Sequence, residues 1–213
     1  MSEVTLTPAA TRELLLDIAD RIIAAEPELS AADRALGDGD HGLGMQRGMK
    51  AVQAKLAETP EDTAIDQLLM TSGMAMLSSM GGASGALFGT LFRAGGKALS
   101  GRESLDGDGL ADFYRAALEG VQSRGKAKPG DKTMVDALAP AAEAANRERA
   151  AGLQAVATAA AAAAVAGRDA SSAMLATMGR AKSLGQGSIG HPDAGACSIA
   201  IICQAVADYV DKA

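Results

Sequence analysis

Apolar residues recur at every third or fourth position along most of the chain, which is the spacing of one face of an α-helix. The first stripe predicts a helix that starts at Thr7, a typical N-cap residue followed by Pro8, and ends near Pro27. A short turn from Ser30 to Asp33 should then lead into a polar loop. Further stripes predict helices over residues 41–56, 62–80, 87–99, 106–124, 135–145, 151–166, 169–178 and 196–210.

These stripes predict an all-α fold. No segment shows the alternation of a β-strand, and no linker divides the chain, so we expect residues 1–213 to form a single domain. The connections between consecutive helices are short. They predict about eight antiparallel helices that run up and down, with the loops gathered at two ends.

The composition predicts closely packed helices and argues against some partners. Of the residues, 48% are hydrophobic, yet the chain has no Trp, two Tyr and three Phe, so small and flexible side chains must fill the core. The net charge of −6 argues against nucleic acid and against an anionic membrane surface, because both attract basic patches. The Ala-rich run at 155–166 is too short and too weakly apolar to span a membrane.

The two cysteines are not expected to form a disulfide. Cys197 and Cys203 are six residues apart, so on a helix they are separated by about 9 Å along the axis and point in different directions. Two reduced thiols are typical of a cytoplasmic enzyme. The N-terminal Met-Ser-Glu-Val also lacks the basic and apolar regions of a signal peptide, so we expect a cytoplasmic protein.

The polar loop at residues 33–45 combines three carboxylates and a histidine with four glycines. Asp33, Asp38 and Asp40 would repel one another in a folded loop unless a cation compensated their charge. Their hard oxygen ligands favour Mg²⁺ or Ca²⁺ over zinc. The sequence therefore predicts a metal site in this loop.

An EF-hand and a solvated turn are the other two interpretations of this loop. An EF-hand is excluded because the fifth, sixth and twelfth positions counted from Asp38 hold Gly42, Leu43 and Met49. A solvated turn remains an alternative, because Asp-Gly-Asp sequences are common in turns.

Three further glycine-rich loops precede predicted helices, at residues 81–85, 124–134 and 179–196. The free N–H groups at a helix start attract anions, and the last two loops also carry basic residues, so each is a candidate phosphate site. Glycine turns also simply allow two helices to approach closely, and charged loops are often only solvated.

Taken together, the loops resemble those of the nucleotide-binding L subunit (DhaL) of dihydroxyacetone kinases, which is also the C-terminal kinase domain of the single-chain enzymes. The resemblance covers essentially the full length. It rests on four motifs in the same order: Gly-Asp-Gly-Asp-His-Gly at 37–42, Gly-Gly-Ala-Ser-Gly at 81–85, Gly-Lys-Ala-Lys-Pro-Gly-Asp-Lys-Thr-Met at 125–134 and Ser-Ile-Gly-His-Pro-Asp-Ala-Gly-Ala at 188–196.

The resemblance implies an up-and-down closed barrel of eight antiparallel helices that holds ADP or ATP at one end through two Mg²⁺ ions. It implies that the metals are carried by Asp33, Asp38 and Asp40. No acid or base is assigned, and His41 is either a positioning group or a neutral histidine satisfied beside the loop. The residues that the resemblance implies for nucleotide binding are His41, Gly42, Leu43, Gly44, Gly82, Ala83, Ser84, Gly125, Thr133, Met134, Arg180, Asp193, Ala194 and Gly195.

The chain departs from the family pattern at two places. Gly44 stands where the family usually has asparagine, which puts one polar contact and hence the nucleotide affinity in doubt. Asp193-Ala194-Gly195 stands where the family often has Asp-Pro-Gly, which loosens the turn without removing a ligand.

The function implied by the resemblance is phosphoryl transfer from Mg-nucleotide to a short-chain ketose, dihydroxyacetone or a tetrulose, held on a separate K subunit. One alternative is a phosphotransferase-system relay, in which bound ADP is rephosphorylated by an M subunit. Another is a nucleotide-sensing interaction module without catalysis, against which the three retained aspartates weigh modestly. The sequence does not select the phosphoryl donor, the sugar or the oligomeric state.

Overall fold

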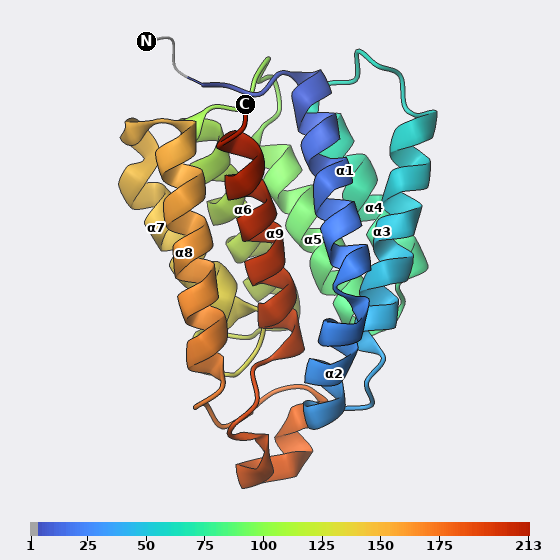
Figure 1. Ribbon diagram of the computed structural model, residues 1–213, viewed down its shortest axis with the longest axis vertical. Helices are drawn as coiled ribbons and strands as arrows, with labels where there is room; N and C mark the ends of the chain where they lie inside the picture. Colours follow the sequence, from blue (N-terminus) through green and yellow to red (C-terminus); the bar gives the residue numbers. More distant parts are fainter. Residues whose placement is uncertain (1–3) are drawn as a thin grey trace.

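The computed structural model describes residues 4–213, and its regular elements are all helical (Figure 1). The α-helices are α1 (Pro8–Ala24), α2 (Glu26–Leu36), α3 (His41–Glu58), α4 (Ile65–Ser79), α5 (Gly82–Ala98), α6 (Gly107–Gly125), α7 (Val135–Glu148), α8 (Leu153–Ser171) and α9 (Ala194–Val210). Two 3₁₀ segments, η1 (Arg149–Ala151) and η2 (Arg180–Ser188), complete them. The one strand-like pairing within residues 4–213 is a bridge between Leu6 and Leu105. The all-α prediction is confirmed.

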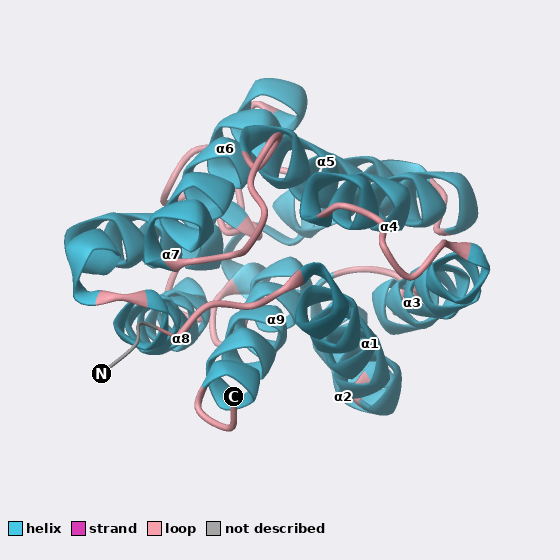
Figure 2. Ribbon diagram, turned by 90° about the horizontal axis from the view of Figure 1, so that it is seen from above, coloured by secondary structure: helices cyan, strands magenta, loops and turns pink. Residues whose placement is uncertain are grey.

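The helices follow one another around the molecule in chain order. Seen from above, each long helix packs beside the next, and α1 contacts both α3 and α9 (Figure 2). Buried alanines such as Ala157 and Ala160 face the contact between α8 and its neighbours, and their small side chains permit close packing. The up-and-down arrangement gathers the loops at two ends, and the finer description as a closed barrel stays a prediction.

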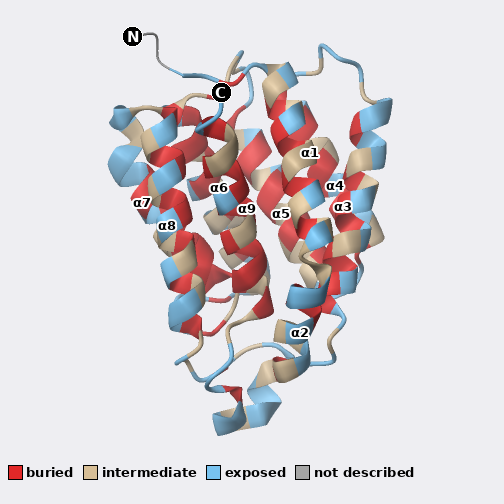
Figure 3. Cartoon of the chain, in the orientation of Figure 1, coloured by how far each residue is buried: buried red, intermediate tan, exposed pale blue. Residues whose placement is uncertain are grey.

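The inward faces of the helices form one continuous core (Figure 3). The stripe predicted for the last helix is buried along its whole length, at Ile199, Ile202, Val206 and Val210. Cys197 and Cys203 are both free and buried, as predicted. None of the helices in the described part of the chain combines the length and the apolar character needed to cross a bilayer. The first three residues, on which the signal-peptide prediction partly rests, lie outside the described residues.

Several predicted helix boundaries were wrong. Pro27 does not end a helix but lies in the first turn of α2, a position where its missing N–H costs nothing. The predicted short turn from Ser30 to Asp33 is therefore part of an 11-residue helix. The predicted helix at 169–178 is not separate, because α8 continues to Ser171 and irregular backbone follows. The helix predicted from residue 62 begins at Ile65.

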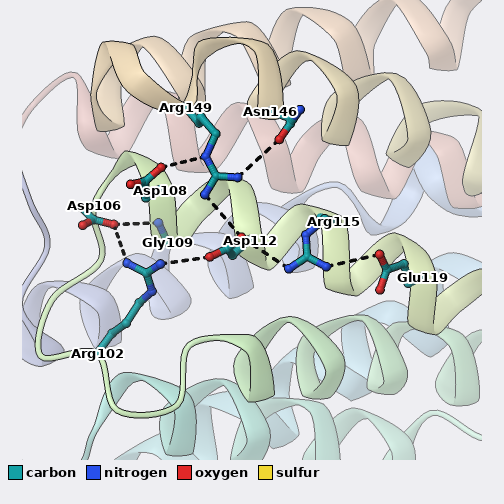
Figure 4. A network of polar contacts seen from close by, with 9 residues as sticks. All are labelled: Arg102, Asp106, Asp108, Gly109, Asp112, Arg115, Glu119, Asn146 and Arg149. Carbon is teal, nitrogen blue, oxygen red and sulfur yellow. Dashed lines mark hydrogen bonds and ion pairs between the residues drawn. The ribbon is translucent and has the colours of Figure 1, made fainter.

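Arginine side chains form ion pairs between the loops at the end of the molecule where α6 begins. Arg102 joins Asp106 at 3.1 Å and Asp112 at 3.0 Å, and Arg149 reaches Asp108 at 2.8 Å (Figure 4). Solvent-accessible pairs contribute roughly 0–1 kcal/mol each, and these side chains are only partly buried, so the network orients loops more than it stabilises the fold.

Candidate functional site

Three carboxylates meet where α2 ends and α3 begins. Asp33 lies in the last turns of α2, Asp38 in the connecting loop and Asp40 at the N-cap of α3. One oxygen of each carboxylate lies within 4.8 Å of those of the other two. Asp38 and Asp40 are exposed and Asp33 is half-buried. Convergent, accessible carboxylate oxygens fit Mg²⁺, which uses a few carboxylates and fills its remaining positions with water and phosphate.

A guanidinium group of the chain lies against this cluster. Arg180, the first residue of η2, forms an ion pair with Asp38 and has a nitrogen 3.8 Å from an Asp40 oxygen. Its side chain is 65% exposed, so the pair contributes little to stability. The contact shows that Asp38 and Asp40 face η2, which lies before α9 in the chain.

The start of α3 is pressed against α2. A Cβ at Gly42 would lie 2.4 Å from the carbonyl oxygen of Glu26 and 2.4 Å from Oγ of Ser30. Ser30 is held there by donating to Glu26 at 2.6 Å. Only glycine fits at position 42, and the missing side chain lets α2 and α3 approach closely. The main-chain N–H of His41 then donates to Asp33 at 3.1 Å.

The His41 side chain connects the carboxylate loop with α5 and α9. Its Nδ1 lies 3.3 Å from Oγ of Ser84, and its Nε2 lies 2.8 Å from Oγ of Ser198. His41 as a whole residue is 7% exposed. Burial lowers the pKa of His41, although the charge of Asp33 and a hydrogen bond to the Ala194 carbonyl partly oppose this shift.

Two helix N-termini lie beside the carboxylates. The first is that of α3, which starts at His41. The second is that of α5, where the N-cap Gly81 and the first helical residue Gly82 have φ of +73° and +60°. These left-handed conformations favour glycine, and no described side chain caps the start of α5. The free amides of this turn are suited to binding an anion.

The loop before α7 is held by a buried lysine. Lys132 is 2% exposed, and its Nζ donates to the carbonyl oxygens of Ser171 and His191 at 2.6 Å each. Asp136 accepts from the amides of Gly130 at 2.5 Å and Thr133 at 2.7 Å. Lys132 is therefore committed to main-chain carbonyls, and a phosphate environment formed by the other basic residues of the loop stays a prediction.

Asp193 lies behind the same loop and caps α9 by accepting from the amide of Ala196 at 2.8 Å. Burial, together with the nearby charge of Asp136, raises the pKa of Asp193 to about 7, although the Ala196 amide and Lys132 oppose the shift. Burial also lowers the pKa of Lys132, against the influence of Asp193 and Asp136. Lys132, Asp136 and Asp193 therefore lie close enough for their charges to influence one another.

These elements enclose a cavity of about 390 Å³. Such a volume is within the range of small-molecule sites. Apolar side chains form part of its wall, at Leu36, Met80, Leu87, Phe88 and Met178. The predicted site residues that line it are Asp33, Asp38, Asp40, His41, Gly44, Gly82, Ala83, Ser84, Thr133, Met134, Arg180, Asp193, Ala194 and Gly195.

Comparison with known families matches residues 35–208 to the DAK2 domain. The chain belongs to the DAK2 domain family. This match starts after Asp33, so the first carboxylate of the cluster lies just outside the matched residues of the DAK2 domain.

Relatives of this DAK2 domain support the resemblance to DhaL. The "PEP-dependent dihydroxyacetone kinase, ADP-binding subunit DhaL" of Escherichia coli (strain K12) is 43% identical over 189 residues, which are 87% of this chain and 90% of that protein. The "L-erythrulose kinase" of Pectobacterium atrosepticum is 41% identical over 91% of this chain, which corresponds to 33% of that longer protein.

The fold of this DAK2 domain is also found in a solved structure. The dihydroxyacetone kinase of C. freundii, in its complex with AMP-PNP and Mg²⁺, has a TM-score of 0.73 and 24% sequence identity over 97% of this chain. The matched part is 35% of that protein. The similarity confirms the helical fold.

Three predicted residues of the DAK2 domain are not in the cavity wall. Gly42 faces α2, Leu43 is 50% exposed, and a Cβ on Gly125 would meet Leu87 at 2.9 Å. For Gly42 and Gly125 the glycine serves packing between elements, and Leu43 points away because successive helical residues diverge by about 100°.

Sequence reasoning missed several wall residues. Arg47 lines the cavity and donates to the Met80 carbonyl at 3.1 Å. It lies one helical turn after Gly44, so the i, i+3 spacing within α3 could have identified it. Lys132 and Met178 also line the cavity, but their placement depends on tertiary contacts that no local spacing signals.

Proposed function

We propose that this chain is the nucleotide-binding, phosphoryl-transferring subunit of a dihydroxyacetone-type kinase, and that its sugar substrate is held by a separate K-type subunit. The observation that carries the proposal is the cluster of Asp33, Asp38 and Asp40 at a cavity bordered by two helix N-termini. The names of the relatives agree with it, because DhaL of Escherichia coli is an ADP-binding kinase subunit that this chain matches over most of its length.

The three carboxylates fit Mg²⁺ in number, ligand type and mutual distance, and we propose that they hold two ions. When bound, Mg²⁺ neutralises phosphate charge that develops during transfer. The carboxylates supply the negative charge that retains the cations, and the amides at the starts of α3 and α5 provide donors for phosphate oxygens. Arg180 would exchange its carboxylate partner for phosphate, since both accept from a guanidinium.

The remaining cavity wall fits the apolar part of a nucleotide. Leu87, Phe88 and Met134 line the cavity and present apolar surface to a base. No side chain in the wall is assigned as a general base. Phosphoryl transfer needs mainly positioning and charge neutralisation, so the arrangement does not require one.

The phosphoryl donor separates two versions of this function. In the first, ATP exchanges freely and supplies the phosphate. In the second, ADP stays bound and is rephosphorylated by an M subunit of a phosphotransferase system. The similarity to a subunit of a PEP-dependent kinase favours the second version. The two buried free thiols agree with the predicted cytoplasmic location of either version.

Reconstitution tests the proposal. The purified chain is combined with a K-type subunit, Mg²⁺ and dihydroxyacetone or a tetrulose, and sugar phosphate is measured with ATP and, separately, with phosphorylated M subunit. Product with ATP supports the exchangeable version, and product only with phosphorylated M subunit supports the relay. Tight Mg-ADP binding without product from either donor would instead support a nucleotide-sensing module. Absence of Mg-ADP binding would overturn the proposal.

A further inference from the structure

A line of polar groups runs from the cavity wall into the core behind it. Ser84 Oγ lies 3.3 Å from Nδ1 of His41, and Nε2 of His41 lies 2.8 Å from Oγ of Ser198. Ser198 Oγ in turn donates to the carbonyl oxygen of Ala194 at 3.2 Å. The line joins α5, α3 and α9. Ser198 is 0% exposed and does not line the cavity, so any effect it has on a ligand must pass through His41.

The directions of these hydrogen bonds follow from the buried end. The Ala194 carbonyl can only accept, and it takes the single proton of the Ser198 hydroxyl. Ser198 Oγ is then an acceptor for the proton on Nε2 of His41. A neutral imidazole carries one ring proton, so Nδ1 has none and accepts from the Ser84 hydroxyl. His41 is buried beside Phe88, and the side-chain partners of its two ring nitrogens are hydroxyl groups, which a neutral ring can satisfy at both nitrogens.

We propose that Ser198 is a positioning residue of the site, which fixes the His41 ring with its proton on Nε2 and thereby orients the Ser84 hydroxyl. The proton of Ser84 is directed to His41, and the oxygen turns its lone pairs toward the cavity. Ser84 then offers an acceptor to a cation or to an N–H or O–H group of the ligand, and it does not donate to a phosphate oxygen. This inference rests on the proposed function for the identity of the ligand.

The alternative arrangement makes a different prediction for the same atoms. If Ser198 donated to Nε2, the ring proton would lie on Nδ1 and point to Ser84, and the Ser84 hydroxyl would be free to donate to phosphate. The two arrangements differ in the position of one proton. They can be distinguished by nitrogen NMR of the histidine ring, independently of any activity measurement.

The experiment uses the full chain labelled with ¹⁵N-histidine, without nucleotide. The chain has two histidines, and the exposed His191 can be replaced to assign the signals of His41, since only the carbonyl of His191 contacts Lys132. We expect the spectrum of His41 to show a protonated Nε2 and an unprotonated Nδ1. In Ser198→Ala the ring loses the hydroxyl acceptor and keeps only its contact with the Ala194 carbonyl, and we expect a population with the proton on Nδ1.

Mg-ADP affinity is measured on the same proteins. Loss of one hydrogen bond that orients Ser84 should weaken Mg-ADP binding by about three- to tenfold. The matched control is Ser72→Ala, because Ser72 is also buried on a helix and also donates to the carbonyl four residues earlier, but contacts no histidine. The control should leave both the His41 spectrum and the affinity unchanged.

A proton on Nδ1 in the parent would overturn the inference, as would a Ser198→Ala spectrum identical to that of the parent. The parent spectrum decides the proton position even if Ser198→Ala fails to fold. A parent with the expected spectrum that binds no Mg-ADP would overturn the proposed function while supporting the hydrogen-bond arrangement. The two failures are thus distinguishable.

Discussion

Two glycines near the start of α3 should respond to the same substitution with opposite changes in stability. A Cβ at Gly42 would lie 2.4 Å from a carbonyl oxygen of α2 and 2.6 Å from the amide nitrogen of Ser30, which are backbone atoms that cannot move without shifting the helix. At Gly44 the nearest atom to an added Cβ is Nη2 of Arg47 at 4.0 Å, so the methyl group has room.

The expected magnitudes follow from these distances. Overpacking of this kind costs about 1–3 kcal/mol, so Gly42→Ala should lower the free energy of unfolding by that amount. Gly44→Ala should raise it by about 0.5–1 kcal/mol, because alanine restricts the unfolded chain and favours the helix. For a chain of this length each kcal/mol shifts Tm by about 2–4 °C.

Urea unfolding of the protein without nucleotide, followed by circular dichroism, measures both changes. Because the two residues lie in the same turn of one helix, differences in helix propensity are matched and only the contact with α2 differs. Gly42→Ala should also weaken Mg-ADP binding, since separating α2 from α3 draws Asp33 away from the His41 amide. Equal stability of Gly42→Ala and the parent would refute the close contact between α2 and α3.

Four further predictions concern charge and ligands. Asp38→Asn and Asp40→Asn should each abolish Mg-ADP binding in calorimetry while the circular dichroism spectrum stays unchanged. Normal Mg-ADP affinity in both variants would contradict the metal site and support the interpretation of the loop as a solvated turn. Saturating Mg-ADP should stabilise the parent by about 2.7 kcal/mol at 100 times Kd in thermal melts, with little effect of Mg²⁺ alone; an unmoved melt would contradict a kinase role. We expect the exposed Lys126 and Lys128 to steer association with the K subunit electrostatically, so changing both to Glu should slow sugar phosphorylation at limiting K subunit in a salt-dependent way. A parallel loss of ADP binding would show that the two lysines belong to the nucleotide site and not to the surface that contacts the K subunit. The pKa of Asp193 is raised to about 7 in the folded state, whereas an unfolded aspartate has a pKa of about 4. Between these pH values the folded state binds more protons than the unfolded state, so the free energy of unfolding should fall as pH rises from about 4 to 7. Asp193→Asn should flatten that part of the pH dependence of urea unfolding, and an unchanged slope would show that Asp193 ionises normally.

Local patterns were sufficient to predict most helices and the carboxylate cluster. The spacing of apolar residues reports directly which face of a helix is buried, and the buried stripe of α9 shows this plainly. Asp33, Asp38 and Asp40 lie within eight residues, so chain connectivity alone brings them near one another. Pro27 misled the boundary prediction because proline can either end a helix or begin one, and only the contact of α2 with α3 decides.

The rest of the site depends on distant parts of the chain. Lys132 looked like one of several solvated cations, but the carbonyls of Ser171 and His191, which it joins, are 39 and 59 residues away. In the sequence, nothing distinguishes Ser198 from the other small residues of its helix, because its contact with His41 spans 157 residues. Such roles arise from the packing of α3, α8 and α9 and leave no periodic signal in the sequence.

The first described residues and the C-terminus both lie at the end of the molecule opposite the carboxylate cluster (Figure 1). A fluorescent protein, an affinity tag or a surface tether attached at either terminus would therefore leave the opening of the cavity facing solution. Immobilised protein should present every cavity in the same orientation. This polarity makes the chain suitable for single-molecule or surface-based measurements of nucleotide exchange, in which a K-type subunit is supplied from solution.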